Sequence, residues 1–418
     1  MINVEDALSK ILAVFRPLSS QETGILETNG MVLAEDIISE INIPPLDNSA
    51  MDGYAVKYEN VENASSKTPK KLKVVGTTAA GELPYSTLLN NESIRIMTGA
   101  PIPTGANAVV PFEKTSDNFN NKNSNTTSEV QILTSSFVGQ NVRKAGQDVK
   151  NGEVVLKSGS VLHPSHIALI ASVGKATVKV FRRPQVAILA TGNEITKPGN
   201  KLEQGRIYDS NSYGIASAVT EAGGNPLIVG IAKDNFDSIE KKLNQCKDSD
   251  LVITSAGVSK GDFDMVKNVL SQNGTIEFHS VRMKPGKPLA FGVLRQNKKL
   301  IPLVGLPGNP VSALVAFEQF CRPAIRLMLG HKFIPRATIK AILDDDIDNP
   351  DGRRIYARSL VYKKNDVYHV SLIGVQSSNI LSTMGKANGL AICPENKTLV
   401  KAGEAVTVMM LYWPSEVF

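Results

Sequence analysis

The stretch Asp250-Leu-Val-Ile-Thr-Ser-Ala-Gly-Val-Ser-Lys-Gly-Asp-Phe-Asp264 holds the local pattern around which we expect the fold to be organised. Leu251 to Ile253 is a short apolar run typical of a buried parallel strand, and Met265 to Gln272 spaces its apolar residues like a helix. The loop between them carries hydroxyls, and glycines that let backbone N–H groups approach a ligand: Thr254, Ser255, Gly257, Ser259 and Gly261. Because this loop leads into a helix N-terminus, it predicts an anion site.

Two carboxylates lie in the same loop. Asp262 and Asp264 would repel a phosphate unless a divalent cation or a lysine lies between them. The alternative is that an aspartate caps the following helix, a common role that this loop alone does not exclude.

Composition describes a soluble chain with several domains. A length of 418 residues exceeds one hydrophobic core, and 42% hydrophobic with 21% charged residues is typical of globular proteins. The net charge of +6 is scattered and aromatics are few, so no nucleic-acid surface is expected. No apolar stretch is long enough for a membrane span, and Met1 to Lys10 lacks the apolar core of a signal peptide, so we expect a cytoplasmic protein.

The middle of the chain alternates between strand-like and helix-like segments. The strand-like runs are 186–190, 227–232, 251–253 and 300–304, and the helix-like runs are 212–222, 238–246 and 311–329. This alternation predicts a parallel sheet with helices on both faces. Ligands of such sheets bind at the carboxyl ends of strands, and polar clusters fall there at 191–194, 255–264 and 307–310.

The flanking segments have different patterns. Residues 4–15 predict an amphipathic helix, and 161–171 a second one. Residues 71–149 contain short β-rich runs between turns, and short strands return after Gly330, so we expect two small β domains. The polar segment 47–56 before an apolar run is explained by turn chemistry when the residues alone are considered.

Several motifs together resemble one known family. They are Asp47 to Val56, Ile96-Met-Thr-Gly-Ala-Pro101, Gly257-Val-Ser-Lys-Gly-Asp-Phe-Asp264, Lys284-Pro-Gly-Lys-Pro288 and Leu306-Pro-Gly-Asn-Pro-Val-Ser-Ala313. In this order, and nearly end to end, the chain resembles the molybdopterin molybdenumtransferases, which include the catalytic domain of gephyrin-type proteins.

The resemblance implies a multidomain α/β plus β fold. A small α-containing domain would be split between 1–43 and 146–182, and a β-rich domain would be inserted at 44–145. A three-layer α/β molybdopterin-binding domain would cover 183–330, and a C-terminal β barrel 331–418. The family further implies an elongated homodimer with an active cleft shared between subunits.

The resemblance also implies a reaction. Family members take adenylylated molybdopterin (molybdopterin-AMP) and molybdate, release AMP and leave the metal on the dithiolene sulfurs, with Mg²⁺ as the divalent cation. Lys284 and Lys287 match positions that compensate the charge of this polyanion. Ser312, Arg358 and Ser378 match positions that hold the oxoanion, for which arginine and hydroxyls near a helix N-terminus are suited.

The family's acids and substrate contacts carry over residue by residue. Catalytic roles are implied for Asp52, Asp148, Asp234 and Asp264, with Asp52 orienting the attacking oxygen. Asp264 with Glu194 would bind the metal, since magnesium takes one or two carboxylates plus substrate oxygens. Substrate contacts are implied for Thr98, Asp209, Ser255, Gly257, Ser259, Pro307 and Pro310.

The sequence departs from the family at three places and leaves alternatives open. Asn193 and Gln147 replace usual acids, and Ala256 replaces a usual glycine. A molybdopterin adenylyltransferase, which shares the α/β domain, and a non-catalytic scaffold of the same fold are the alternative functions. An adenylyltransferase of the same pathway is also a possible partner. Molybdate and tungstate are both tetrahedral and nearly equal in size, so the residues do not separate them.

Overall fold

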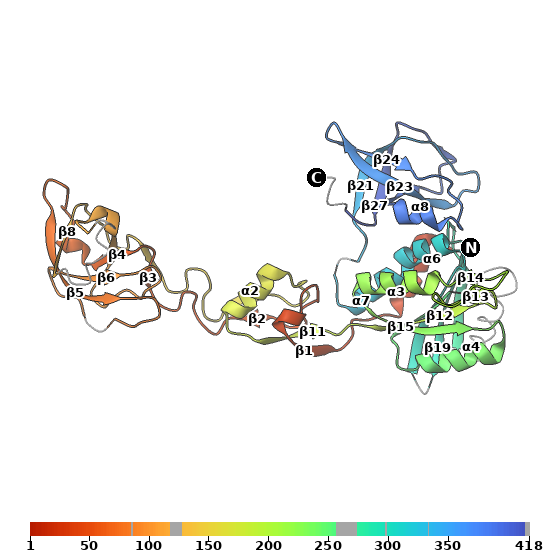
Figure 1. The fold of residues 1–418 in the computed structure, drawn as a ribbon, viewed down its shortest axis with the longest axis horizontal. Coiled ribbons are helices and arrows are strands. Elements are labelled where there is room, and N and C mark those ends of the chain that lie inside the picture. Colours follow the sequence, from red (N-terminus) through yellow and green to blue (C-terminus); the bar gives the residue numbers. More distant parts are fainter. Residues whose placement is uncertain (85–86, 118–127, 256–273, 297–298, 333, 414–418) are drawn as a thin grey trace.

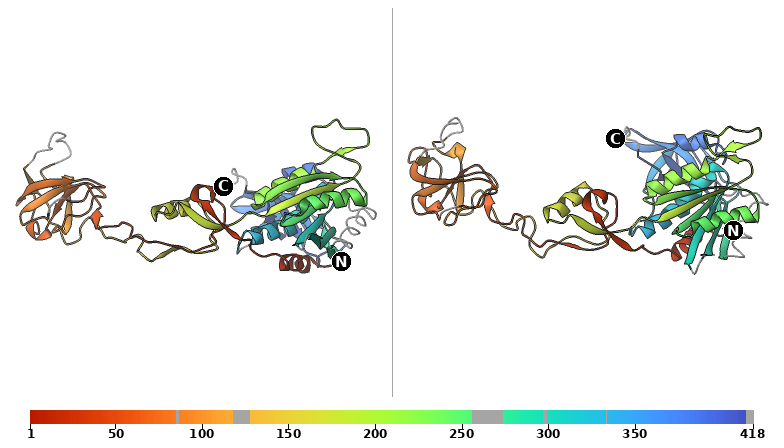
Figure 2. Two further views of the ribbon diagram at one scale, coloured as in Figure 1. Left: turned by 90° about the horizontal axis from the view of Figure 1, so that it is seen from below. Right: turned by 60° about the horizontal axis from the view of Figure 1, so that its bottom comes forward.

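The computed structural model describes residues 1–84, 87–117, 128–255, 274–296, 299–332 and 334–413. The chain is elongated, with one β unit at the far end of a narrow middle section and two units packed together at the other end (Figure 1). Two turned views show the same separation (Figure 2).

A six-stranded sheet forms the centre of the α/β unit, in the order β15-β12-β16-β20-β19-β17. Its strands are β12 (Gln185–Thr191), β15 (Asn225–Ala232), β16 (Leu251–Ser255), β17 (Gly274–Ser280), β19 (Pro288–Gln296) and β20 (Lys299–Leu306). The first four in sheet order are parallel, as the alternating pattern predicts, whereas β19 runs antiparallel to both of its neighbours, β20 and β17. The sheet is therefore mixed, and neither β17 nor β19 was expected from the sequence.

Helices cover both faces of this sheet, which confirms the three-layer arrangement. They are α3 (Asn211–Ala222), α4 (Phe236–Leu243), α6 (Pro310–Ala316) and α7 (Arg322–Met328), with a π-helical turn, η5 (Phe317–Cys321), joining α6 to α7. One apolar core contains Ile215 of α3 and Phe320 of η5, and the other contains Ile239 and Leu243 of α4.

The opening helix α1 (Val4–Ala13) packs onto the first of these cores. Ala7 and Ile11 are completely buried there, beside residues of the central sheet. Although α1 lies within 1–43, its apolar face contacts the α/β unit.

The C-terminal unit is a closed barrel. Its strands pair in the cycle β23-β24-β21-β27-β25 and back to β23, which confirms the expected β barrel. They are β21 (Thr338–Leu343), β23 (Arg354–Lys364), β24 (Val367–Leu372), β25 (Gly389–Cys393) and β27 (Ala405–Met410), with helix α8 (Leu381–Lys386) beside them. Strand β18 (Met283–Lys284) of the α/β unit pairs with β23 and joins the two units.

The inserted β unit contains a five-stranded sheet in the order β7-β4-β6-β5-β8. Its strands are β4 (Gly53–Val56), β5 (Lys70–Thr78), β6 (Glu92–Ile96), β7 (Ala108–Pro111) and β8 (Glu129–Ile132). The β-rich character expected for this part of the chain is confirmed.

The middle section consists of segments from both sides of the insertion. It contains β1 (Ser20–Gly24), β2 (Ile37–Ile38), β10 (Val154–Leu156), α2 (Pro164–Ser172) and β11 (Thr177–Phe181), with β1 paired to β11 and β2 to β10. Farther along, β3 (Asn48–Ser49) pairs with β9 (Val142–Arg143). The outgoing and returning chains thus run side by side as antiparallel partners.

An ion pair fixes the middle section, which we call the arm, where it meets the α/β unit. Arg182 donates two hydrogen bonds of 2.8 Å to the carboxylate of Asp250, and the backbone N–H of Gln185 donates a third at 2.9 Å. Burial works against ionisation of Asp250, but these donors outweigh it and hold its pKa below the usual range. The first residue of the stretch quoted above therefore anchors strand β16 to the arm.

Candidate active site

A cavity of about 980 Å³ lies at the carboxyl edge of the parallel strands, between the α/β unit and the barrel. It is lined by Thr191 at the end of β12, Ser255 at the end of β16 and Pro307 after β20. The three polar clusters predicted to meet at this edge therefore do meet, although 256–264 lies outside the described residues.

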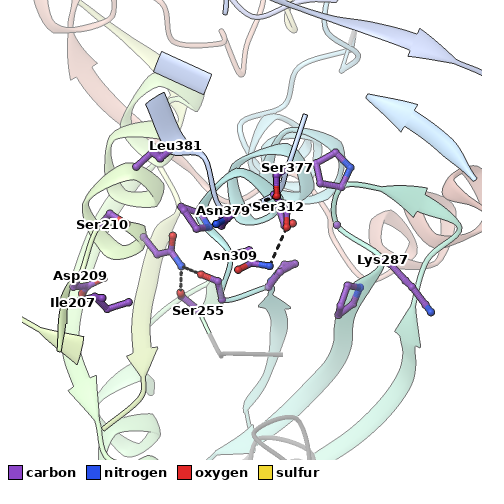
Figure 3. A pocket seen from close by; sticks show the side chains of 18 of the residues that line it. Ile207, Asp209, Ser210, Ser255, Lys287, Asn309, Ser312, Ser377, Asn379 and Leu381 are labelled. Carbon is purple, nitrogen blue, oxygen red and sulfur yellow. Dashed lines mark hydrogen bonds between the residues drawn. The ribbon is translucent and has the colours of Figure 1, made fainter. Parts of the chain in front are cut away.

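Sequence-predicted residues from six parts of the chain line this cavity. They are Glu194, Asp209, Ser255, Lys284, Lys287, Pro307, Pro310, Ser312 and Ser378. The close view shows Asp209, Ser255, Lys287 and Ser312 around one space (Figure 3). Gly257, Ser259 and Asp264 lie outside the described residues.

The two lysines are carried by a turn packed against α6. Gly286 has φ = 101°, in the left-handed region that favours glycine, and a Cβ there would lie 3.0 Å from Cε of Met283 and 3.6 Å from the carbonyl oxygen of Ser312. Lys287 is exposed and Lys284 half-buried, and both residues line the cavity. Arg353, which is paired with Asp351, also lines it and was missed by sequence reasoning.

Two helix N-termini also face the cavity. Ser210 precedes α3, and Asn309 precedes α6, which begins at Pro310 and has Ser312 as its third residue. Free N–H groups at such ends attract anions. Asp209 is buried and accepts the N–H of Ser212 at 2.9 Å, so its carboxylate also serves the start of α3.

Asp234 belongs to a supporting contact outside the cavity lining. Its carboxylate accepts the N–H of Asn193 at 2.9 Å, while the side-chain oxygen of Asn193 accepts the N–H of Asp234 at 3.3 Å. This reciprocal pair ties the loop after β12 to the loop after β15, next to Glu194. The asparagine that departs from the family pattern therefore has a structural partner.

Arg358 lies behind the cavity wall. It is 1% exposed, and its guanidinium donates to the carbonyl oxygens of Val375 and Ser377 at 3.0 Å and of Gln376 at 3.2 Å. A fourth bond of 3.2 Å reaches the hydroxyl of Thr383. The structure thus places Arg358 against the backbone of the loop that carries Ser378.

Three predicted residues lie far from this cavity in the same chain. Asp52 and Thr98 are in the inserted β unit at the opposite end of the molecule (Figure 1). Asp148 is in the returning chain of the middle section, in the segment between β9 and β10. Asp52 Oδ1 accepts both the N–H of Thr98, at 2.6 Å, and its hydroxyl, at 2.7 Å. These two bonds lower the pKa of Asp52, with the backbone N–H as the larger cause.

Sequence reasoning missed several polar residues of the cavity. Asn211, Asn309 and Asn379 line it together with Arg353, and Ile207 and Leu381 give it apolar walls (Figure 3). Asn309 lies in the stretch Leu306 to Ala313 that resembles the family, and Asn211 lies two residues after Asp209, a position carried over from the family, which were the available signals.

A three-ligand cluster of His, Cys, Asp or Glu is absent from the described part of the chain. Glu194 also lines the cavity, and its carboxylate, unlike that of Asp209, does not cap a helix in the contacts above. One carboxylate with substrate oxygens is a suitable donor set for magnesium.

Among the helices in the described part of the chain, none combines the length and the apolar character that a membrane span requires.

Comparisons with known proteins agree with this architecture over the whole chain. Three family models match: the MoeA N-terminal region (domain I and II) at 2–174, a probable molybdopterin binding domain at 187–327, and the MoeA C-terminal region (domain IV) at 340–411. A molybdopterin molybdenumtransferase of Haemophilus influenzae is 36% identical, with 98% of each chain covered. Molybdopterin molybdenumtransferase 2 of Mycobacterium tuberculosis is 35% identical, with 96% of each covered.

A solved structure extends the likeness to three dimensions. The molybdopterin biosynthesis MoeA protein from Pyrococcus horikoshii is similar with a TM-score of 0.85 and 32% identity, over 99% of this chain and 100% of that one. Full-length identity above 30% and matches in all three regions lead to one conclusion: the chain belongs to the MoeA family of molybdopterin molybdenumtransferases.

Proposed function

We propose that this protein inserts the metal of molybdate into adenylylated molybdopterin, with release of AMP in a magnesium-dependent reaction. The observation that carries the proposal is the convergence of Lys284, Lys287 and two helix N-termini on one cavity of about 980 Å³. A substrate with a diphosphate link and a nearby oxoanion needs such a density of cations and N–H donors, because unpaired buried charge is prohibitive.

Different residues of the chain bind different parts of the substrates along the cavity. Lys284 and Lys287 bind and orient the diphosphate, and Ser255 and Asp209 contact the substrate near the start of α3. Ser312 and Ser378 donate hydroxyl hydrogen bonds to the oxoanion at the barrel side. Arg358 supports this end through the loop that it holds.

Glu194, together with Asp264, would hold the magnesium ion. When bound, the ion would neutralise charge that develops on the phosphate during cleavage of the phosphoanhydride. Asp234 keeps the Glu194 loop in place through Asn193.

A homodimer would complete the site. Asp52 and Thr98 have no route to the cavity of their own chain, because the whole arm separates them (Figure 1). In the proposed dimer, Asp52 and Thr98 are delivered to the cavity of the opposite subunit, where ionised Asp52 orients the attacking oxygen. Asp148, in the arm, would approach the same shared cleft. We further propose that the protein works in the cytoplasm and receives its substrate from the adenylyltransferase of the pathway.

The test is a reaction with purified protein. Adenylylated molybdopterin, Mg²⁺ and molybdate should yield AMP and a cofactor that activates an apo-molybdoenzyme, and omission of Mg²⁺ should stop both. ATP-dependent adenylylation of free molybdopterin without AMP release would favour the adenylyltransferase alternative. Absence of molybdopterin binding together with a stable protein partner would favour the scaffold.

A further inference from the structure

Two side-chain amides bridge the loops of the cavity without a role in the proposed chemistry. Asn211, the first residue of α3, donates through Nδ2 to the hydroxyl of Ser255 and to the carbonyl oxygen of Gly308, both at 2.8 Å (Figure 3). One amide thus ties the end of β16 to the loop between β20 and α6.

The second amide continues from that loop into the barrel. Asn309 follows Gly308 directly, and its Nδ2 donates to the hydroxyl of Ser378 at 3.0 Å. This bond crosses from the α/β unit to the C-terminal barrel. Ser255, Asn211, Gly308, Asn309 and Ser378 therefore form one chain of contacts along the cavity, which we call the amide chain.

The barrel end of the amide chain is held from behind as well. Arg358 binds the carbonyl oxygens of residues 375–377, directly before Ser378. With its backbone fixed by Arg358 and its hydroxyl by Asn309, Ser378 has little freedom to adopt other positions. A hydroxyl held in this way is preorganised for a ligand.

We infer that Asn211 and Asn309 are positioning residues that couple the nucleotide end of the cavity, at Ser255, to the oxoanion end, at Ser378. The inference rests on the proposed function, because it takes the substrates from there. A ligand that accepts the hydroxyl proton of Ser255 or Ser378 polarises the hydrogen bonds of the shared amide chain, which strengthens the bond available to the second ligand at the other end. Coupling of this kind is reciprocal: AMP should tighten molybdate binding by the same factor as molybdate tightens AMP binding.

The first experiment measures binding of molybdate and of AMP to the full chain by calorimetry, each alone and with the other saturating. We expect each ligand to tighten the other about 5-fold in the natural protein, the effect of roughly one net hydrogen bond. Asn309→Ala should weaken molybdate binding about 5-fold and remove the coupling. The affinity for AMP in the absence of molybdate should change by less than about 2-fold. Asn396→Ala, at an exposed asparagine of the C-terminal unit, is the matched control and should keep the coupling.

A double-mutant cycle separates positioning from direct contact. If Asn309 acts through Ser378, Asn309→Ala should cause no further loss of molybdate affinity in a Ser378→Ala background. Asn309→Asp reverses the bond, because its carboxylate accepts the Ser378 hydroxyl proton, which is then no longer available to molybdate. This variant should therefore lose the coupling and weaken molybdate binding more than Asn309→Ala does, since like charge adds to the loss of the donor.

Two results would overturn the inference: unchanged coupling in Asn309→Ala, or additive losses in the cycle. A natural protein that binds both ligands without coupling would also refute the inference and leave the proposed function standing. A natural protein that binds neither ligand would refute both.

Discussion

Nη2 of Arg358 lies 3.0 Å from the carbonyl oxygen of Ser377, inside a barrel wall where the arginine is almost wholly buried. Replacement by lysine would leave several of the bound carbonyls without a donor, because one ammonium group cannot reproduce the planar fork. We expect Arg358→Lys to destabilise the barrel by about 2 to 4 kcal/mol and to weaken molybdate binding with it. Calorimetric unfolding of the full chain measures the first effect. Lys363→Ala, which removes an exposed ion pair with Asp366, is the control and should leave stability unchanged.

Removal of a cation at the mouth of the cavity should affect the substrate and not the fold. Lys287→Ala should lower kcat/KM for adenylylated molybdopterin about 10- to 100-fold, because charge-assisted contacts to phosphate are lost. The salt dependence of KM should also become weaker than in the natural protein. Lys401→Ala, an exposed cation of the barrel, serves as control. Equal kcat/KM in both variants would remove Lys287 from the site.

The pH profile should report Asp52. Its pKa is lowered by the N–H and hydroxyl of Thr98, so it stays ionised across the neutral range and loses its charge only as the pH falls through that lowered value. Thr98→Val removes the hydroxyl bond and keeps the larger backbone one, so the pKa should rise part of the way towards its usual value. Carboxyl NMR titration measures this, and the acidic limb of kcat/KM should move to higher pH.

A shared cleft predicts complementation between impaired subunits. Asp52→Ala and Lys287→Ala alter residues that the proposal assigns to opposite subunits of one site. After mixing and subunit exchange, half of the dimers would be hybrids with one intact site of two, which gives about a quarter of natural activity. Each variant alone should show only its own residual activity, and a mixture that never exceeds the separate variants would contradict the shared cleft.

The ion pair between Arg182 and Asp250 should make the stability of the protein depend on pH. The Asp250 carboxylate has a lowered pKa, so its stabilising effect is present above the unfolded value of about 4 and is lost as the pH falls through the folded value. Asp250→Asn should cost about 2 kcal/mol at pH 7, less than a fully buried pair, because the Arg182 side chain is 35% exposed. At pH 2 to 3 the difference from the natural protein should shrink, which calorimetry at both pH values measures.

The sequence predicted long periodic elements well. The helical spacing of 311–329 and the apolar run at 300–304 correspond to Pro310–Met328 and β20, because each buries a continuous apolar face. Strand β19 was missed because it begins at Pro288 and contains Gly292, which weaken a strand pattern, and its antiparallel pairing has no local signal.

The residues of the site were predicted on different grounds. Clustering at strand ends follows from topology, so Ser255 and Pro307 were found from the residues themselves. The positions of Lys284, Ser312 and Ser378 came from family resemblance, since no local pattern brings a barrel loop to a sheet edge. Asn211 and Asn309 were missed because their partners, Ser255 and Ser378, are 44 and 69 residues away.

The insertion leaves and re-enters the middle section at one place, since Ile43 and Val149 form a bridge between the outgoing and returning chains. Its two ends are therefore neighbours in space, and the inserted β unit is joined to the rest of the protein at this one place. A short linker across these ends should yield a compact protein that still folds around the central sheet. Such a truncated form should lack catalytic turnover, because Asp52 and Thr98 are removed. It should keep the proposed oxoanion pocket, so that oxoanion binding can be measured directly.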